Sequence, residues 1–136
     1  MNSPLLGIDI GLQRTGVALS ESGLIARPLK VIEADQPHMS KVLHALIDCV
    51  REYEIKTVVI GMPYTEEGSP TNQALKVEHI ISAFKNLLSE ENLPVEIEEV
   101  NEFYSTQEAK ALFPDSELDA AAAAIILQEY INQHSE

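Results

Sequence analysis

One apolar stretch near the N-terminus constrains the fold of this chain more than any other. Residues 5–20 read LLGIDIGLQRTGVALS, which is two apolar runs with a single carboxylate, Asp9, inside the first. Gly11 and Gly16 flank the segment between the runs, and glycine permits the positive φ angles that tight turns use. The stretch therefore predicts two paired strands joined by a tight turn.

Asp9 is the chemically informative residue of this stretch. A charge inside a buried strand costs several kcal/mol unless another group compensates it. A metal ion or a reacting group is one such compensation, because the neighbouring glycine would let a ligand approach. Two structural roles are the alternatives, namely that Asp9 caps the turn or that it pairs with Arg14.

The rest of the chain alternates between helix and strand patterns. Pro28 cannot donate to a sheet ladder, so the third strand is expected at a sheet edge or to be interrupted. The expected elements are a strand at 25–32, a helix opening at 35–37, a strand at 56–61, a helix from 69, a strand at 95–102, a helix from 105 and a last helix from 116. This order predicts an α/β fold with a mixed five-stranded sheet and helices on both faces, in a single domain spanning residues 1–136.

Charge and cysteine content limit the environment and the partners. The 22 acidic and 9 basic residues give a net charge of −13. A non-specific nucleic-acid binder normally relies on a basic surface. A nucleic-acid substrate would therefore require bound metal cations, a local arrangement of the few basic residues, or a partner.

The single cysteine and the lengths of the apolar runs indicate where the protein is located. The single cysteine, Cys49, cannot form an internal disulfide and is expected to be a small buried hydrophobe. The longest apolar run, at 120–127, is too short to cross a bilayer, and no signal peptide is recognised. We therefore expect a cytoplasmic protein that does not enter a membrane.

Three carboxylates are predicted to meet at one edge of the sheet. The first, fourth and fifth strands would run parallel, and ligands of open α/β sheets collect at the carboxyl ends of such strands. Asp9 and Glu102 lie at two of these ends, and Asp119 starts the last helix. Carboxylates without histidine or cysteine suit Mg²⁺ or Mn²⁺. Alternatively, Glu102 is a solvated acid of an acidic strand and Asp119 stabilises a helix N-terminus.

Four segments resemble, in the same order, motifs of the bacterial YqgF family, also called RuvX. They are Gly7–Ser20, Val58–Pro63, Asn101–Ala109 and Leu118–Gln128. Members of that family are ribonuclease-H-like proteins associated with Holliday junction resolution or with trimming of the 5′ end of pre-16S ribosomal RNA. The resemblance implies a ribonuclease-H-like fold and a metal-dependent nuclease.

The resemblance also assigns residues. It implies that the metal-binding, catalytic acids are Asp9, Glu102 and Asp119. Arg14 matches a basic position that would face phosphate, and Thr106 matches a polar position after the second acid. The family usually reads Asp-Glu-Arg where this chain has Asn101, Glu102 and Phe103, so one arginine and one aspartate beside the site are missing.

Three functions follow from these observations. The first is a nuclease that uses Mg²⁺ or Mn²⁺ to hydrolyse phosphodiester bonds of structured RNA or branched DNA, for which a homodimer would suit a two-strand junction. The second is a non-catalytic member that binds nucleic acid or acts in ribosome assembly, which the acidic charge and Phe103 favour. The third is a phosphate-binding domain, because residues 7–11 also resemble the first phosphate loop of sugar kinases, which use two such domains.

Overall fold

The computed structural model describes residues 2–11, 14–33, 39–62, 72–101 and 118–134, and within residues 72–73 and 118–119 it describes the backbone only. In chain order the elements are β1 (Leu5–Ile10), β2 (Arg14–Ser20), β3 (Arg27–Glu33), α1 (Met39–Glu52), β4 (Thr57–Met62), α2 (Asn72–Glu90), β5 (Glu96–Asn101) and α4 (Leu118–His134). The helix expected from residue 105, and the helix starts expected at 35–37, 69–70 and 116, lie outside the described residues.

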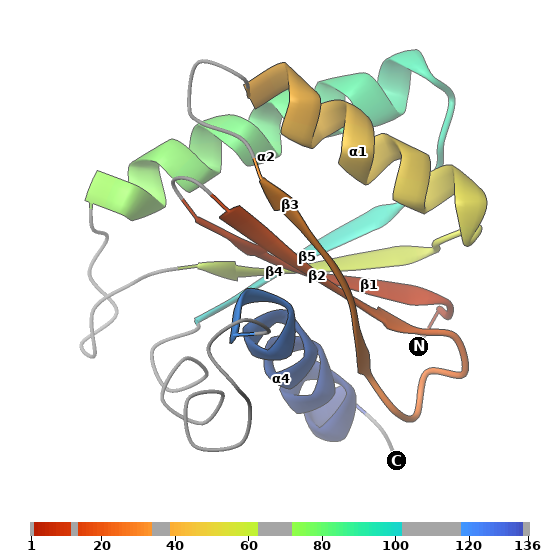
Figure 1. Cartoon of the computed structure of the whole chain (residues 1–136). Coiled ribbons are helices and arrows are strands. Elements are labelled where there is room, and N and C mark those ends of the chain that lie inside the picture. Colours follow the sequence, from red (N-terminus) through yellow and green to blue (C-terminus); the bar gives the residue numbers. More distant parts are fainter. Residues whose placement is uncertain (1, 12–13, 34–38, 63–71, 102–117, 135–136) are drawn as a thin grey trace.

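The five strands form one mixed sheet in the order β3-β2-β1-β4-β5 (Figure 1). β2 is antiparallel to both β1 and β3, whereas β1, β4 and β5 run parallel. All six residues of β4 are buried, as is typical of a strand in the middle of a sheet that is covered on both faces. The predicted mixed five-stranded sheet is confirmed.

Helices cover both faces of this sheet. Figure 1 shows α1 and α2 on one face and α4 on the other. Successive residues of β1 alternate between the two cores: Leu6 and Ile8 belong to the core under α1 and α2, and Leu5 belongs to the core under α4. The predicted arrangement of helices on both sides is therefore also confirmed.

Pro28 lies in an edge strand, as predicted. β3 pairs only with β2 among the described strands, and Pro28 stands opposite Ala18, where the pairing register shifts. A proline is tolerated there because an edge strand needs hydrogen bonds on one side only.

The reason given for the tight turn after β1 was wrong. Gly16 lies within β2 and pairs with Asp9, and among the described glycines the positive φ belongs to Gly23, at 82°. Glycine is required at position 11 because a side chain would not fit there, and not because of the φ angle. Its N–H donates to the Arg14 carbonyl oxygen over 3.0 Å, and a Cβ on Gly11 would collide with that same oxygen.

The apolar faces of the two helices on the first side pack as their periodicity predicts. On α1, Val42, Leu46 and Val50 are buried, and Cys49 is fully buried as a free thiol, as expected. On α2, Val77, Ile81 and Phe84 are buried in the same core. In the described part of the chain, no helix has the length and apolar character needed to cross a membrane.

Candidate active site

Asp9 lies on the α4 side of the sheet, one residue before the end of β1. Side chains of a strand alternate between faces, and Leu5 and Gly7 both contact α4, so Asp9 shares their face. Its neighbours Ile8 and Ile10 are buried on the opposite face, whereas Asp9 itself is partly exposed. The carboxylate therefore reaches solvent from within an otherwise buried strand.

Glycines flank Asp9 on both neighbouring strands. Gly16 of β2 is its direct partner. On β4, Ile60 pairs with Ile8, so the next residue, Gly61, lies level with Asp9. Neither glycine carries a side chain that could cover the carboxylate.

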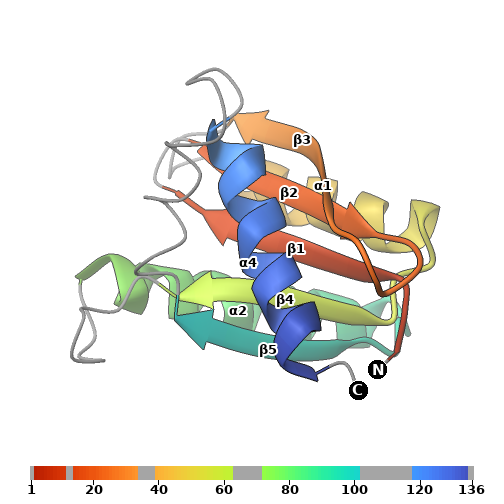
Figure 2. The ribbon, with the colours of Figure 1, turned by 90° about the horizontal axis from the view of Figure 1, so that it is seen from below.

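Helix α4 lies unusually close to β1 beside this site. A Cβ on Gly7 would come 2.8 Å from the Leu127 Cβ and 2.9 Å from the Ala123 carbonyl oxygen. The alanines at 120–124 are all buried, and their small side chains permit this close approach. Asp119 lies one helical turn before Ala123, and Figure 2 shows that α4 begins over β2 and β3 and crosses the sheet toward β5.

Strand β5 brings its carboxyl end to the same edge. Its pairing with β4 continues without a shift to Asn101, the residue before Glu102. Ile97 packs into the core under α2 and Val100 into the core under α4. This two-sided packing explains why the sequence of the strand shows no simple alternation: each face of this edge strand takes one apolar residue, and its three glutamates are exposed.

The structure locates three of the five predicted site residues. Asp9 is placed with its side chain, and Asp119 is placed by backbone in the first turn of α4. Arg14 is exposed at the start of β2, and by strand alternation it shares a face with Gly16 and Asp9. Glu102 and Thr106 lie outside the described residues. Among the described side chains, no three histidine, cysteine or acidic groups come together as a metal site. Of the three predicted metal ligands, only Asp9 has a described side chain.

Gln128 is a positioning residue that the sequence reasoning did not single out. Its Oε1 accepts a hydrogen bond from the Ala26 backbone N–H over 2.8 Å, and its Nε2 donates to the Leu24 carbonyl oxygen over 3.1 Å. These bonds tie the loop between β2 and β3 to the middle of α4. The sequence carried no signal for them, because the partners are about a hundred residues apart and are backbone groups.

Comparison with known proteins identifies the family. The family model described as RuvX, Holliday junction resolvase, matches residues 3–133. The chain belongs to the RuvX family. Relatives include a protein of Sulfurihydrogenibium sp. named "Putative pre-16S rRNA nuclease", which is 34% identical over 98% of this chain and 92% of the relative. A Rickettsia akari relative of the same name is 31% identical over 97% of this chain and 88% of its own length.

Solved structures show that this RuvX-family chain has the fold of the RuvC resolvases, which is ribonuclease-H-like. The structure of Thermus thermophilus RuvC in complex with a Holliday junction substrate matches with a TM-score of 0.62 and 17% identity, over 98% of both chains. The yeast mitochondrial Holliday junction resolvase Ydc2 matches with a TM-score of 0.51 and 12% identity, over 97% of this chain and 81% of that one. At such low identities the likeness concerns the fold.

The surroundings of Asp9 fit a divalent cation bound by oxygen ligands. Asp9 is a partly exposed carboxylate paired with a glycine, and Mg²⁺ is bound through one or two carboxylates while it retains several waters. No histidine or cysteine of the described residues stands at this end of β1, β4 and β5, which agrees with a hard, oxygen-preferring ion.

Proposed function

We propose that this protein is a metal-dependent nuclease whose site is built on Asp9, Glu102 and Asp119. The observation that supports it most is the geometry around Asp9. The carboxylate lies between two glycines on the face of the sheet that α4 covers, the helix that carries Asp119 packs on the same strand, and β5 ends at the residue before Glu102. Membership of a family described as Holliday junction resolvases supports the same conclusion.

The three acids would hold Mg²⁺ or Mn²⁺. When bound, such ions lower the pKa of a water ligand and stabilise the charge that develops on the phosphate. The protein's own contribution is positional: Asp9 is carried by a rigid central strand, and Asp119 by a helix packed directly on that strand. Both ligands would thus be held on elements that move little, as a precise metal site requires.

Arg14 is proposed to contact a substrate phosphate. It is exposed at the start of β2, on the face that carries Asp9, and its guanidinium suits bidentate recognition of phosphate. Thr106 is proposed as a second polar contact. The few basic residues of a chain with net charge −13 make each such contact important, since the metal ions would have to offset the remaining repulsion.

The proposed substrate is structured RNA, specifically the 5′ end of pre-16S ribosomal RNA. The relatives of 31–34% identity carry that activity in their names, whereas the resolvase structures are only 12–17% identical. A four-way DNA junction is the second substrate to test, because the family model is described by it. We also propose a cytoplasmic location, in keeping with a single cysteine that is buried and reduced.

A cleavage assay tests this proposal. The purified protein is incubated with a pre-16S rRNA fragment and with a four-way junction, in Mg²⁺, in Mn²⁺ and in excess chelator. Asp9→Asn and Asp119→Asn should each abolish cleavage. Asp48→Asn is the matched control, because it makes the same chemical change at an exposed position of α1, on the opposite face of the sheet. Cleavage that persists in chelator or in Asp9→Asn would refute the proposal.

A non-catalytic binding role is the alternative, and the acidic charge together with Phe103 in place of arginine favours it. It predicts that the protein binds the pre-16S fragment without cleaving it under any divalent metal. Restoring the basic residue with Phe103→Arg separates the two cases. A nuclease with a weakened substrate contact should cleave faster after this change, whereas a binding protein should gain affinity alone.

A further inference from the structure

Among the described residues, no strand pairs with the outer edge of β5, meaning the side that faces away from β4. β5 is the last strand of the sheet as described, and it pairs with β4 on its inner side. The Glu96 N–H donates inward to the Lys56 carbonyl oxygen, so by alternation Ile97 and Glu99 direct their backbone groups outward. An edge with outward N–H and C=O groups is a template for one more strand.

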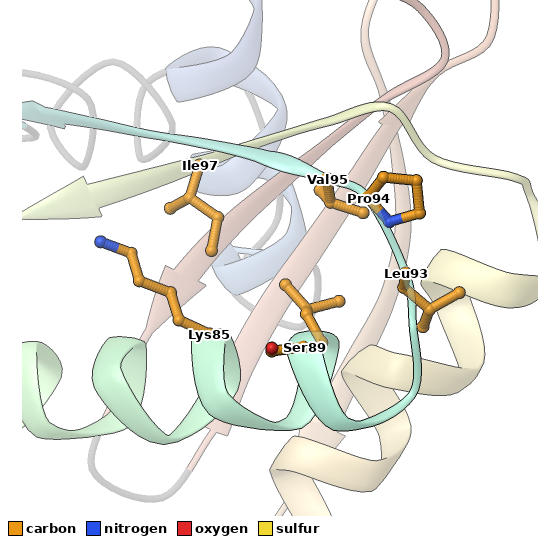
Figure 3. Close-up of a pocket in the computed structure, with 7 residues that line it drawn as sticks. Lys85, Ser89, Leu93, Pro94, Val95 and Ile97 are labelled. Atoms are coloured by element: carbon orange, nitrogen blue, oxygen red, sulfur yellow. The ribbon is translucent and has the colours of Figure 1, made fainter.

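A groove lies beside β5 on each face of the sheet. On the α2 face, a groove of about 430 Å³ is lined mainly by apolar side chains, including Leu88, Leu93, Val95 and Ile97. Figure 3 shows Lys85 extending from α2 toward β5 next to Ile97. The apolar lining suits an apolar side chain, and the ammonium group of Lys85 disfavours a basic one in this groove.

The groove on the α4 face has the opposite character. It measures about 400 Å³, and its lining includes the acidic residues Glu98 and Glu129 together with Tyr130 and His134 of α4. The Tyr130 and His134 rings stack with their centroids 4.1 Å apart, which gives the groove an aromatic wall. Acidic groups beside an aromatic ring favour a lysine or arginine side chain.

We propose that the outer edge of β5 binds an extended segment of a partner protein in which apolar and basic side chains alternate. Side chains of an added strand point alternately to the two faces of the sheet. Apolar residues of the segment would enter the groove on the α2 face, and basic residues would enter the groove on the α4 face. Backbone hydrogen bonds to Ile97 and Glu99 would complete the sheet.

Charge excludes the two other occupants of this edge. A second copy of the chain would pair β5 with itself. Directly opposite residues share a face of the sheet, so an antiparallel pairing centred on Glu98 would place Glu98 against Glu98 of the other copy, with like charges opposite each other. A nucleic acid would bring phosphates against Glu96, Glu98 and Glu99, in a strand with no basic residue. A basic protein segment is the occupant whose charge complements the strand.

Binding of a designed peptide tests this inference independently of any nuclease activity. The probe is a fluorescent peptide as long as β5 in which Val and Lys alternate, and its binding is followed by fluorescence anisotropy. Two control peptides accompany it: one of the same composition with the valines and lysines in separate blocks, and one with Glu in place of Lys. The alternating Val/Lys peptide should bind, and both controls should bind at least about tenfold more weakly.

Two variants of one residue separate backbone pairing from charge. Glu99→Pro removes the outward N–H of an edge position without touching the bonds to β4, and it should weaken peptide binding about tenfold while the folded structure persists by circular dichroism. Glu99→Gln keeps that N–H and should weaken binding only a few fold, with a smaller salt dependence. A Glu99→Pro variant that folds and binds as wild type would overturn the inference.

Competing occupants are distinguished in the same samples. The protein alone should not self-associate through β5. Analytical ultracentrifugation tests this, because any self-association through β5 would be lost in Glu99→Pro. A labelled single-stranded RNA should show no binding that depends on Glu99. Either effect, if found, would assign the β5 edge to a second copy or to nucleic acid and would overturn the inference, as would equal binding of all three peptides.

Discussion

Gly7 lies directly beneath Leu127, so that a methyl group on Gly7 would come 2.8 Å from the Leu127 Cβ and 2.9 Å from the Ala123 carbonyl oxygen. This contact sets the height of α4 above β1. Asp9 lies two residues after Gly7 on the same face of β1, and Asp119 lies one turn before Ala123 on α4. The distance between two of the proposed metal ligands therefore depends on the absence of a side chain at Gly7.

Gly7→Ala should separate the two elements. Because the added Cβ meets backbone and a Cβ rather than a flexible side chain, α4 must shift, at a cost of about 1–3 kcal/mol in the free energy of unfolding. Cleavage should fall by much more than this stability loss explains, because metal ligands tolerate little displacement. Thermal denaturation and cleavage kinetics measure the two effects.

Gly23→Ala is the matched control for that experiment. Gly23 has a φ of 82°, so alanine is strained there by about 1–3 kcal/mol, but the residue lies in the loop between β2 and β3 and does not set the height of α4. This variant should lose stability and keep its cleavage rate below its melting temperature. Equal loss of cleavage in both variants would contradict the role given to Gly7.

Metal binding should be visible as stabilisation. A ligand that binds only the folded state raises the free energy of unfolding by about 2.7 kcal/mol at 100 times its Kd. The melting temperature of the wild type should therefore rise with Mn²⁺ and fall back in chelator. Asp9→Asn should remove this shift, whereas Asp48→Asn should retain it. An unchanged shift in Asp9→Asn would remove Asp9 from the metal site.

Gln128 should hold the loop between β2 and β3 against α4. Gln128→Ala removes the acceptor for the Ala26 N–H and the donor to the Leu24 carbonyl, which should lower stability by about 1–2 kcal/mol. Hydrogen exchange at Ala26 should accelerate, while exchange within β4 should change only with global stability. Gln133→Ala, an exposed position of the same helix, serves as the control. Unchanged exchange at Ala26 would show that the loop does not depend on Gln128.

Stability should fall in alkaline solution because of Cys49. Burial raises the pKa of the Cys49 thiol, an effect that nearby Lys30 only partly offsets. Above about pH 8.5 the unfolded chain loses this proton while the folded state retains it, so the folded state binds more protons and loses stability as the pH rises. Denaturant unfolding of the wild type and of Cys49→Ala between neutral and alkaline pH should show a flatter profile for the variant.

The same burial protects the thiol from reagents. Cys49 is fully buried, so alkylation should require opening of the structure and should follow the unfolding equilibrium. Mass spectrometry after incubation with iodoacetamide, with and without denaturant, measures this. Rapid alkylation of the folded protein would contradict the placement of Cys49.

Local pattern was sufficient to predict most of the fold. The wholly apolar run of β4 indicated a strand buried on both faces, Pro28 indicated an edge or an interrupted strand, and the spacing of Val42, Leu46 and Val50 indicated the buried face of α1. Each of these signals is local, because burial on one face or two imposes a period on the residues of the element itself. Asp9 was identified in the same way, as a charge in a run that is otherwise buried.

Only the tertiary structure decided what surrounds that carboxylate. The pairing register places Gly16 and Gly61 on either side of Asp9, and the packing of α4 requires glycine at position 7. The tertiary structure also assigned Ile97 and Val100 to opposite faces of β5, an assignment that the sequence had left open. These relations join residues far apart in the chain, and they depend on strand register and helix height, which no local period encodes. The sequence by itself determined that an acid stands in a buried strand, and the tertiary structure determined that this strand is the central one and that glycines flank the acid on both neighbouring strands.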